Sequence, residues 1–323
     1  MLLLVKESSY EHPVHSLIMD PTDKVWKNYF TDAELKEILM HDIKQLPDLS
    51  EEMEEILQQF EFQGKTALEF YEFADNIKAH PINEFNKKWT KESIKSACEL
   101  FFGCEELVLD DCSESDLLHS VWEFMHRLYQ QKGIKAKLGE RVSKAVSSAK
   151  NAGRAIKAIE RRLRKAMGAK LDILFKAGIH ELGSCEVGKH GVDESDDKYI
   201  NDGLLKLPKT LRDMLAVQIR SNPSKINDLV AVGYLMMGLS MELVVMNVPK
   251  GKHIARVTRT EKFPFPSTME SFSADFLSLL ELAWKGHEMM KKNLAALNRR
   301  KRKAAVLVTG DEESVILAPS FSL

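Results

Sequence analysis

The chain has 323 residues, of which 44% are hydrophobic, 29% charged and 8% aromatic, fractions that are typical of a soluble globular protein. Its formal net charge is −2, from 46 basic and 48 acidic side chains, which excludes a histone-like basic protein and an acidic disordered chain. The small sum conceals an asymmetry. Residues 1–130 carry 12 basic and 27 acidic side chains, whereas residues 131–170 carry 13 basic and two acidic ones. Such a block indicates either a polyanionic partner or a solvated helix face.

The acidic front of the chain is predicted to be an α-helical region over residues 1–112. Residues 1–25 contain two prolines and little periodicity, so we interpret them as a loose leader. Apolar residues then recur at helical spacing in four segments, which predicts helices over 31–43, 50–60, 67–78 and 91–102. The excess of acidic side chains makes this region a candidate surface for a protein partner.

A patterned helix and a basic linker follow. Ser113-Glu114-Ser115-Asp116 has the form of a helix cap, and the apolar residues after it predict a helix up to residue 128. Residues 131–168 are basic and poor in large apolar side chains. We interpret them as a weakly packed helical connector.

The remaining chain is predicted to form a sheet flanked by helices. Strand-like apolar runs separated by turn residues occupy 170–175, 179–188, 229–236, 241–248 and 253–260, and helical patterns occupy 204–219 and 273–297. The fold class is therefore α/β in the broad sense (α+β), with a mixed-sheet domain over 113–297. Residues 298–323 are predicted to be a basic run and a flexible tail.

Residues 229–248 form an apolar stretch long enough to cross a membrane. Glu242, Asn247 and two interior glycines instead favour two strands joined by a turn. The four cysteines have no CxxC spacing, so we expect reduced thiols in an intracellular protein. We therefore expect a soluble protein with no membrane partner.

Five consecutive basic residues, Arg299, Arg300, Lys301, Arg302 and Lys303, lie near the C-terminus. A run of this kind serves as a nuclear import signal or a phosphate-binding patch. The alternative is a charged helix C-terminus, which the helix dipole favours. The run predicts a nuclear location, with the cytoplasm as the alternative.

Two carboxylates lie inside predicted strands, where an unpaired buried charge is costly. Asp172 and Glu186 are in successive strands, and paired carboxylates bind a divalent cation such as Mg²⁺. By the two-residue period of a strand, Glu181 and Glu186 cannot both point into the same site. Glu186 is preferred because a turn and Lys189 follow it. Structural alternatives remain: Asp172 pairs with Lys170 or Arg164 at a strand edge, and Glu186 caps the following loop.

The spacing of Asp172 and Glu186-Val187-Gly188-Lys189 resembles the PD-(D/E)xK, or restriction-endonuclease-like, nuclease superfamily over roughly residues 113–297. The resemblance implies a Mg²⁺-dependent nuclease, a hydrolase, with Asp172 and Glu186 as metal ligands and Lys189 stabilising the phosphate charge. In that superfamily a helix that carries an acid precedes the strands. The matching residue here is Glu114 or Asp116, and we prefer Glu114.

The pattern departs from that superfamily at the lysine, which is expected two residues after the glutamate, where this chain has Gly188. A bulge at Gly188 would re-aim Lys189. Alternatively, Lys206 or Lys209 reaches the site from the following helix. Without any of these, the domain is a degenerate nuclease fold that binds without cutting. The stretches 166–175, 186–189 and 205–215 are also similar to a group of multicopy fungal proteins whose activity is unassigned.

The leading hypothesis is thus a nucleic-acid-binding protein that hydrolyses phosphodiester bonds in DNA or RNA. Its phosphate contacts are predicted in the basic segment. The residues assigned to them are Arg154, Lys157, Arg161, Arg162, Arg164 and Lys165. The rival is a non-catalytic nuclear interaction or regulatory protein, in which the acidic region binds a partner or covers the basic segment.

Overall fold

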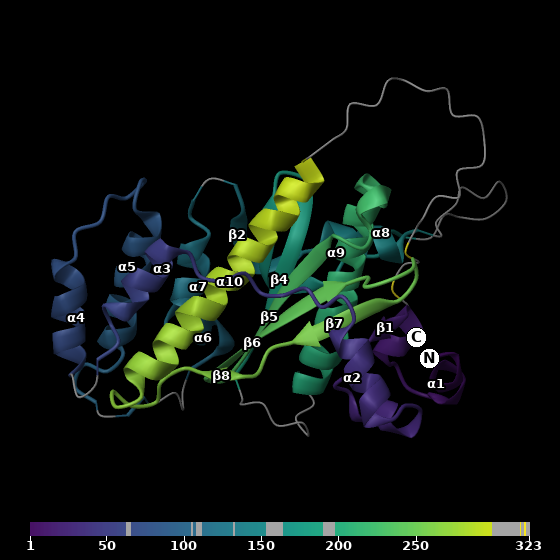
Figure 1. Cartoon of the computed structure of the whole chain (residues 1–323), viewed down its shortest axis with the longest axis horizontal. Helices are drawn as coiled ribbons and strands as arrows, with labels where there is room; N and C mark the ends of the chain where they lie inside the picture. The colour runs from purple at the N-terminus through teal and green to yellow at the C-terminus, as the bar shows by residue number, and fades with distance from the viewer. Residues whose placement is uncertain are drawn as a thin grey trace.

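The computed structural model describes most of the chain (Figure 1). The described residues are 1–62, 66–104, 106–107, 112–131, 133–152, 164–189, 198–298, 317 and 320. Among them the protein has the predicted α+β class, with helices packed on a mixed sheet. No helix in these ranges is both long and apolar enough to cross a membrane.

Capped helices form the acidic front of the chain. The side chains of Thr31, Ser50 and Thr66 each accept a hydrogen bond from the backbone N–H three residues on, which satisfies a donor that the helix itself leaves unpaired. These helices are α2 (Asp32–Met40), α3 (Glu51–Gln58), α4 (Ala67–Asn76) and α5 (Phe85–Glu99). The four predicted helices are confirmed, although the last begins at residue 85 rather than 91.

The interpretation of residues 1–25 as a loose leader is wrong. They form α1 (Leu2–Glu7), η1 (Pro13–Ser16) and β1 (Ile18–Met19), with η2 (Lys24–Asn28) directly after them. Val14 and Trp26 are fully buried, and β1 pairs in parallel with a strand from the far end of the chain. A strand of two residues is too short to show a periodic pattern in the sequence. Pro13 occupies the first turn of a short helix, where a proline does not indicate disorder.

Two further expectations fail between residues 113 and 168. The single predicted helix is divided into α6 (Glu114–His119) and α7 (Glu123–Leu128). The described part of the basic linker is not helical throughout, because the strand β2 (Lys135–Val142) precedes α8 (Lys144–Lys150). β2 is an edge strand, and most of its side chains are exposed. An exposed edge strand rich in lysine lacks the apolar alternation that marks a strand in a sequence.

The sheet has the order β1-β7-β6-β5-β4-β3-β2, and β8 pairs with β6 beside this path. Its other strands are β3 (Lys170–Ala177), β4 (His180–Gly188), β5 (Val230–Met237), β6 (Ser240–Asn247), β7 (Ala255–Arg259) and β8 (Phe263–Pro264). The five predicted strands are confirmed. β4 and β5 are parallel, so the chain must cross from one end of the sheet to the other between them.

That crossover contains η3 (Tyr199–Lys206), a π-helix, followed by α9 (Leu207–Ser221) and η4 (Pro223–Lys225), and the last helix is α10 (Phe272–Asn298). A Cβ atom at Gly233 of β5 would meet Leu207 and Leu211 of α9, whereas one at Gly286 of α10 would meet Tyr234. Because neighbouring residues of a strand point to opposite faces, α9 and α10 cover opposite faces of the sheet (Figure 1).

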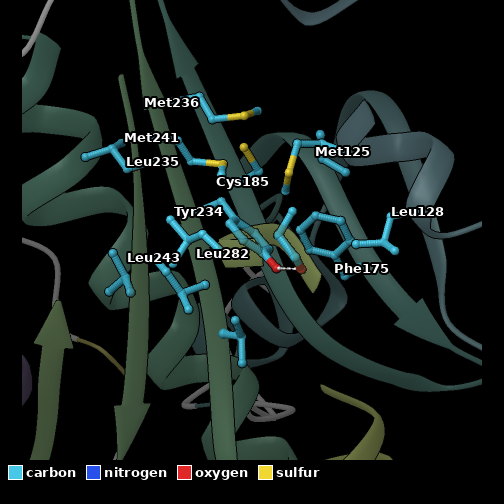
Figure 2. Packing of buried hydrophobic residues seen from close by; sticks show 14 of the residues in the cluster. Met125, Leu128, Phe175, Cys185, Tyr234, Leu235, Met236, Met241, Leu243 and Leu282 are labelled. Atoms are coloured by element: carbon cyan, nitrogen blue, oxygen red, sulfur yellow. Dashed lines mark hydrogen bonds between the residues drawn. The ribbon is translucent and has the colours of Figure 1, made fainter. Parts of the chain in front are cut away.

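The core between the sheet and α10 is aromatic and continuous. Figure 2 shows Met125 and Leu128 of α7 close to Phe175 and Tyr234 of the sheet. The rings of Phe175 and Tyr234 are 5.6 Å apart, and the Tyr234 hydroxyl donates to the carbonyl of Ala283, 2.9 Å away. One cluster of buried residues extends from α3 to α10. The division at residues 112 and 297 stays a prediction.

Candidate functional site

Asp172 and Glu186 lie side by side on the face of the sheet that α9 covers. Ile173 of β3 is the antiparallel partner of Cys185 of β4, so Asp172, one residue before Ile173, lies opposite Glu186, one residue after Cys185, and the two share a face. The backbone N–H of Val187 donates to Asp172 Oδ2 at 2.8 Å. The strands therefore present two carboxylates at the end of β4.

Glu186 is fully buried and only one of its oxygens is paired. Oε2 accepts a hydrogen bond from the ammonium group of Lys206 at 2.5 Å, whereas Oε1 has no hydrogen-bond partner among the described residues. Burial raises the pKa of Glu186 to about 8 against the opposing charge of Lys206. Burial also raises the pKa of Asp172, and the charge of Glu114 acts in the same direction.

The π-helix η3 and the residue directly before it, Lys198, supply the cations of this site. Lys198, Asp202 and Lys206 follow one another at four-residue spacing. Asp202 lies 3.9 Å from the ammonium of Lys198 and 3.6 Å from that of Lys206, and Lys198 forms an ion pair with Glu114 of α6. Charges thus alternate from α6 through η3 to β4. With Asp172, four carboxylates face two ammonium groups, an excess of two negative charges when all are ionised.

A buried arginine holds η3 against the sheet. Arg259 of β7 donates to the carbonyl of Gly203 at 3.0 Å, and also to Asp20 at 2.6 Å and Glu242 at 2.5 Å. A Cβ atom at Gly203 would lie 2.6 Å from the Cδ2 atom of Leu235 of β5, so a larger residue there would force the Leu235 side chain to shift, whereas glycine allows η3 to lie this close to the sheet without that change. Arg259 and Gly203 thereby fix the position from which Lys206 reaches Glu186.

The structure distinguishes the three lysines, Lys189, Lys206 and Lys209, that the sequence offered as the lysine of the site. Lys189 directly follows β4 and is exposed, whereas Lys206 contacts Glu186. Lys209, on the first turn of α9, forms an ion pair with Glu11. Lys206 is therefore the lysine beside the carboxylates, where the resemblance had assigned Lys189.

The hydrogen bonds and ion pairs of Glu114 and Asp116 agree with the preference for Glu114 as the acid of α6. Asp116 accepts a hydrogen bond from Ser113 at 2.6 Å and closes the cap of α6, which leaves Glu114 as the acid of α6 that faces the site. Glu181 accepts hydrogen bonds from the start of α8, at Lys144 and Ala145, and so belongs to a helix cap at the other end of β4.

The structural alternatives for the two site carboxylates are not observed. Among the described residues, Asp172 forms no ion pair with Lys170 or Arg164, and Lys170 instead contacts Glu140 at 2.5 Å. Glu186 pairs with Lys206 rather than capping a loop. Sequence reasoning missed Lys198, Asp202 and Arg259. The four-residue spacing of the first two with Lys206 was a readable signal. Nothing in the sequence pairs Arg259 with Gly203.

The predicted phosphate contacts lie only in part within the described chain. Arg164 and Lys165 are exposed. Arg154, Lys157, Arg161 and Arg162 lie outside the described residues, as does the basic run 299–303. Basic side chains are also exposed on β2, next to the strand that carries Asp172. These residues are Lys135, Lys137 and Arg141.

The donor set suits a hard cation in part. Mg²⁺ is usually held by one or two carboxylates together with water and substrate phosphates, and Asp172 and Glu186 provide two, one with an unpaired oxygen. Across the described ranges no group of three or more His, Cys, Asp or Glu side chains is placed to hold a metal ion. The other ligand positions would therefore fall to water and phosphate.

Comparisons with protein-family models, with curated proteins and with solved structures gave no match to this chain.

The raised pKa of Glu186 predicts a pH-dependent stability of the metal-free protein. Between the ordinary pKa of 4.5 and about 8, the folded state retains a proton that the unfolded state has lost, so the contribution of Glu186 to stability falls as the pH rises. We expect Glu186→Gln to gain melting temperature relative to the wild type between pH 5 and pH 8, both measured by thermal unfolding with EDTA. A difference between the two proteins that is constant with pH would contradict the assignment.

Proposed function

We propose that this chain acts on nucleic acid, as a Mg²⁺-dependent phosphodiester hydrolase with a PD-(D/E)xK-type site. The observation that carries the proposal is the fully buried Glu186, which lies beside Asp172 on the sheet: its Oε2 contacts Lys206, and its Oε1 has no hydrogen-bond partner among the described residues. A buried carboxylate with an unpaired oxygen lowers the free energy of unfolding, so the stability of the fold does not explain it. Its retention next to a second carboxylate supports a cation-binding role.

Asp172 and Glu186 would hold Mg²⁺, which when bound lowers the pKa of a coordinated water and polarises a phosphate oxygen. The ammonium group of Lys206 would stabilise the charge that develops on the phosphate. Lys198 holds Glu114 at the border of the site, so Glu114 would orient water or a further cation rather than act alone. Nucleophilic attack by water would release a phosphate monoester and a hydroxyl.

The exposed basic side chains of β2 and of residues 164–165 would supply sequence-independent contacts to the phosphate backbone. In this proposal DNA and RNA are both candidate substrates. The basic run 299–303 would direct the chain to the nucleus.

The direct test is to incubate the full chain with supercoiled plasmid, or with RNA, in Mg²⁺ or in EDTA. We expect cleavage in Mg²⁺ only, and a loss of at least about 100-fold in Asp172→Ala and Glu186→Gln. Asp75→Asn, which changes an exposed carboxylate of α4, is the matched control. Metal-dependent cleavage that survives Asp172→Ala would refute the site.

A second candidate is a nuclease fold that binds polyanions without cutting them. Lys198 and Lys206 already pair with Glu114 and Glu186, as they would in a site that does without a metal. A salt titration of DNA binding separates the two functions from a protein-interaction role. Neutralising Arg161, Arg162, Arg164 and Lys165 together should weaken binding and flatten its salt dependence in both nucleic-acid cases. No affinity in either protein would favour the interaction role.

A further inference from the structure

A groove with a volume of 570 Å³ lies between α3 and the first half of α10, at the end of the molecule that holds α3–α5 (Figure 1). α3 and the turn after it line one wall with residues three or four positions apart: Glu54, Leu57, Gln58 and Glu61. The other wall repeats this spacing over 270–281. The hydroxyl of Ser273 donates to the carbonyl of Phe60 at 2.8 Å, which joins the two walls.

The groove combines an apolar floor with an acidic rim. Its lining includes the apolar side chains of Leu49, Leu57, Phe62 and Leu277 and the carboxylates of Glu54, Glu61, Glu270 and Glu281. No lysine, arginine or histidine lines it among the described residues. Glu281 pairs with Lys285 at 2.6 Å, and no ion pair is recorded for the other three within the described chain. Their charge therefore remains available to a partner.

The geometry points to a helical occupant. The lining residues of α10 run from Ser273 to Glu281, which is more than two helical turns, or about 12 Å, and Glu270 extends this wall before the helix begins. Two helices that diverge around an apolar floor accept the apolar face of a third helix. Because the charged side chains among the described lining residues are all carboxylates, electrostatic complementarity favours a positively charged partner.

We propose that this groove binds a basic amphipathic helix of a partner protein, about three turns long. The apolar residues of that helix would contact Leu57 and Leu277, and its lysines or arginines would pair with Glu54, Glu61 and Glu270. This surface is separate from Asp172 and Glu186 and does not depend on the hydrolytic proposal.

The test uses the full chain and a fluorescent model peptide of about 14 residues, built from leucine and lysine with the leucines on one helical face. Binding is followed by fluorescence anisotropy at about 0.15 M salt. We compare the wild type with Glu54→Lys/Glu61→Lys/Glu270→Lys, and with Glu37→Lys/Glu72→Lys/Glu99→Lys, which makes the same charge change at exposed helical sites elsewhere.

We expect the control triple variant to bind within about twofold of the wild type, and the groove variant at least about tenfold more weakly. Ala274→Arg, which introduces a bulky cation at an exposed lining position, should cause a similar loss while keeping a wild-type circular dichroism spectrum. Equal weakening in both triple variants would show non-specific attraction and overturn the proposal. So would a dimer of the wild type that the groove variant dissociates in sedimentation, because a second copy would then occupy the groove.

Discussion

Replacement of Arg259 by leucine is expected to lower the free energy of unfolding by about 3–5 kcal/mol. Arg259 is almost fully buried and pairs with Asp20 and Glu242, whose side chains are also buried. Removing the guanidinium leaves two carboxylates without their counter-charge, and it also removes the donor to the Gly203 carbonyl. The measurement is urea unfolding followed by circular dichroism.

The matched control is Arg127→Leu, which breaks an Arg–Glu pair that is about a quarter exposed on α7. Such pairs contribute about 0–1 kcal/mol, so this variant should stay close to the wild type. Adding Glu242→Gln to Arg259→Leu should restore part of the lost free energy of unfolding, because one of the two unpaired buried carboxylates is then neutral. If Arg259→Leu costs no more than Arg127→Leu, the buried cluster does not hold η3 in place.

Replacement of Lys206 by methionine is expected to lower the rate of phosphodiester cleavage by about 10²–10³-fold, the usual cost of removing one charge-stabilising donor from an active site. Lys206 lies 2.5 Å from Glu186, to which it reaches from η3. Lys189 is exposed beyond the end of β4. Lys189→Met should therefore leave the rate within about twofold of the wild type.

Methionine keeps the length of the lysine stem, so Lys206→Met tests the charge rather than the packing. The melting temperature of each variant and its affinity for Mn²⁺ are measured in parallel, which separates loss of chemistry from loss of the fold or of the metal. Lys206→Arg should retain part of the rate because it keeps the charge. If Lys189→Met instead lowers the cleavage rate strongly and Lys206→Met does not, then Lys189 rather than Lys206 is the lysine that acts in the site.

The choice of Glu186 over Glu181 shows how much the two-residue period of a strand predicts about the site. Once residues 179–188 are recognised as a strand, alternation places the two glutamates on opposite faces. The structure then places Glu186 beside Asp172 and Glu181 at the cap of α8. Alternation did not decide this by itself, because the register of β3 and β4 shifts between Phe175 and Lys176, whose partners in β4 are Gly183 and Glu181, so the strand is irregular between the two glutamates.

The lysine of the site shows where such reasoning ends. The sequence offers three lysines after Glu186: Lys189 in the next few residues, and Lys206 and Lys209 in the following helical segment. Only the path of η3, held by Arg259 and allowed by Gly203, brings Lys206 to Glu186. That path depends on contacts between residues more than 50 positions apart, which no local spacing encodes.

The sequence by itself determined the class of the fold, the capped helices, the five central strands and the pair of carboxylates. Each of these follows from periodicity, capping residues or turns within a few neighbouring residues. Tertiary structure alone decided that β1 joins the sheet, that the basic segment forms the edge strand β2, and that Lys206 lies beside Glu186. Strand pairing and ion pairing across the chain are settled by the packing of distant elements, because a short or charged strand gains its stability from its neighbours rather than from its own pattern.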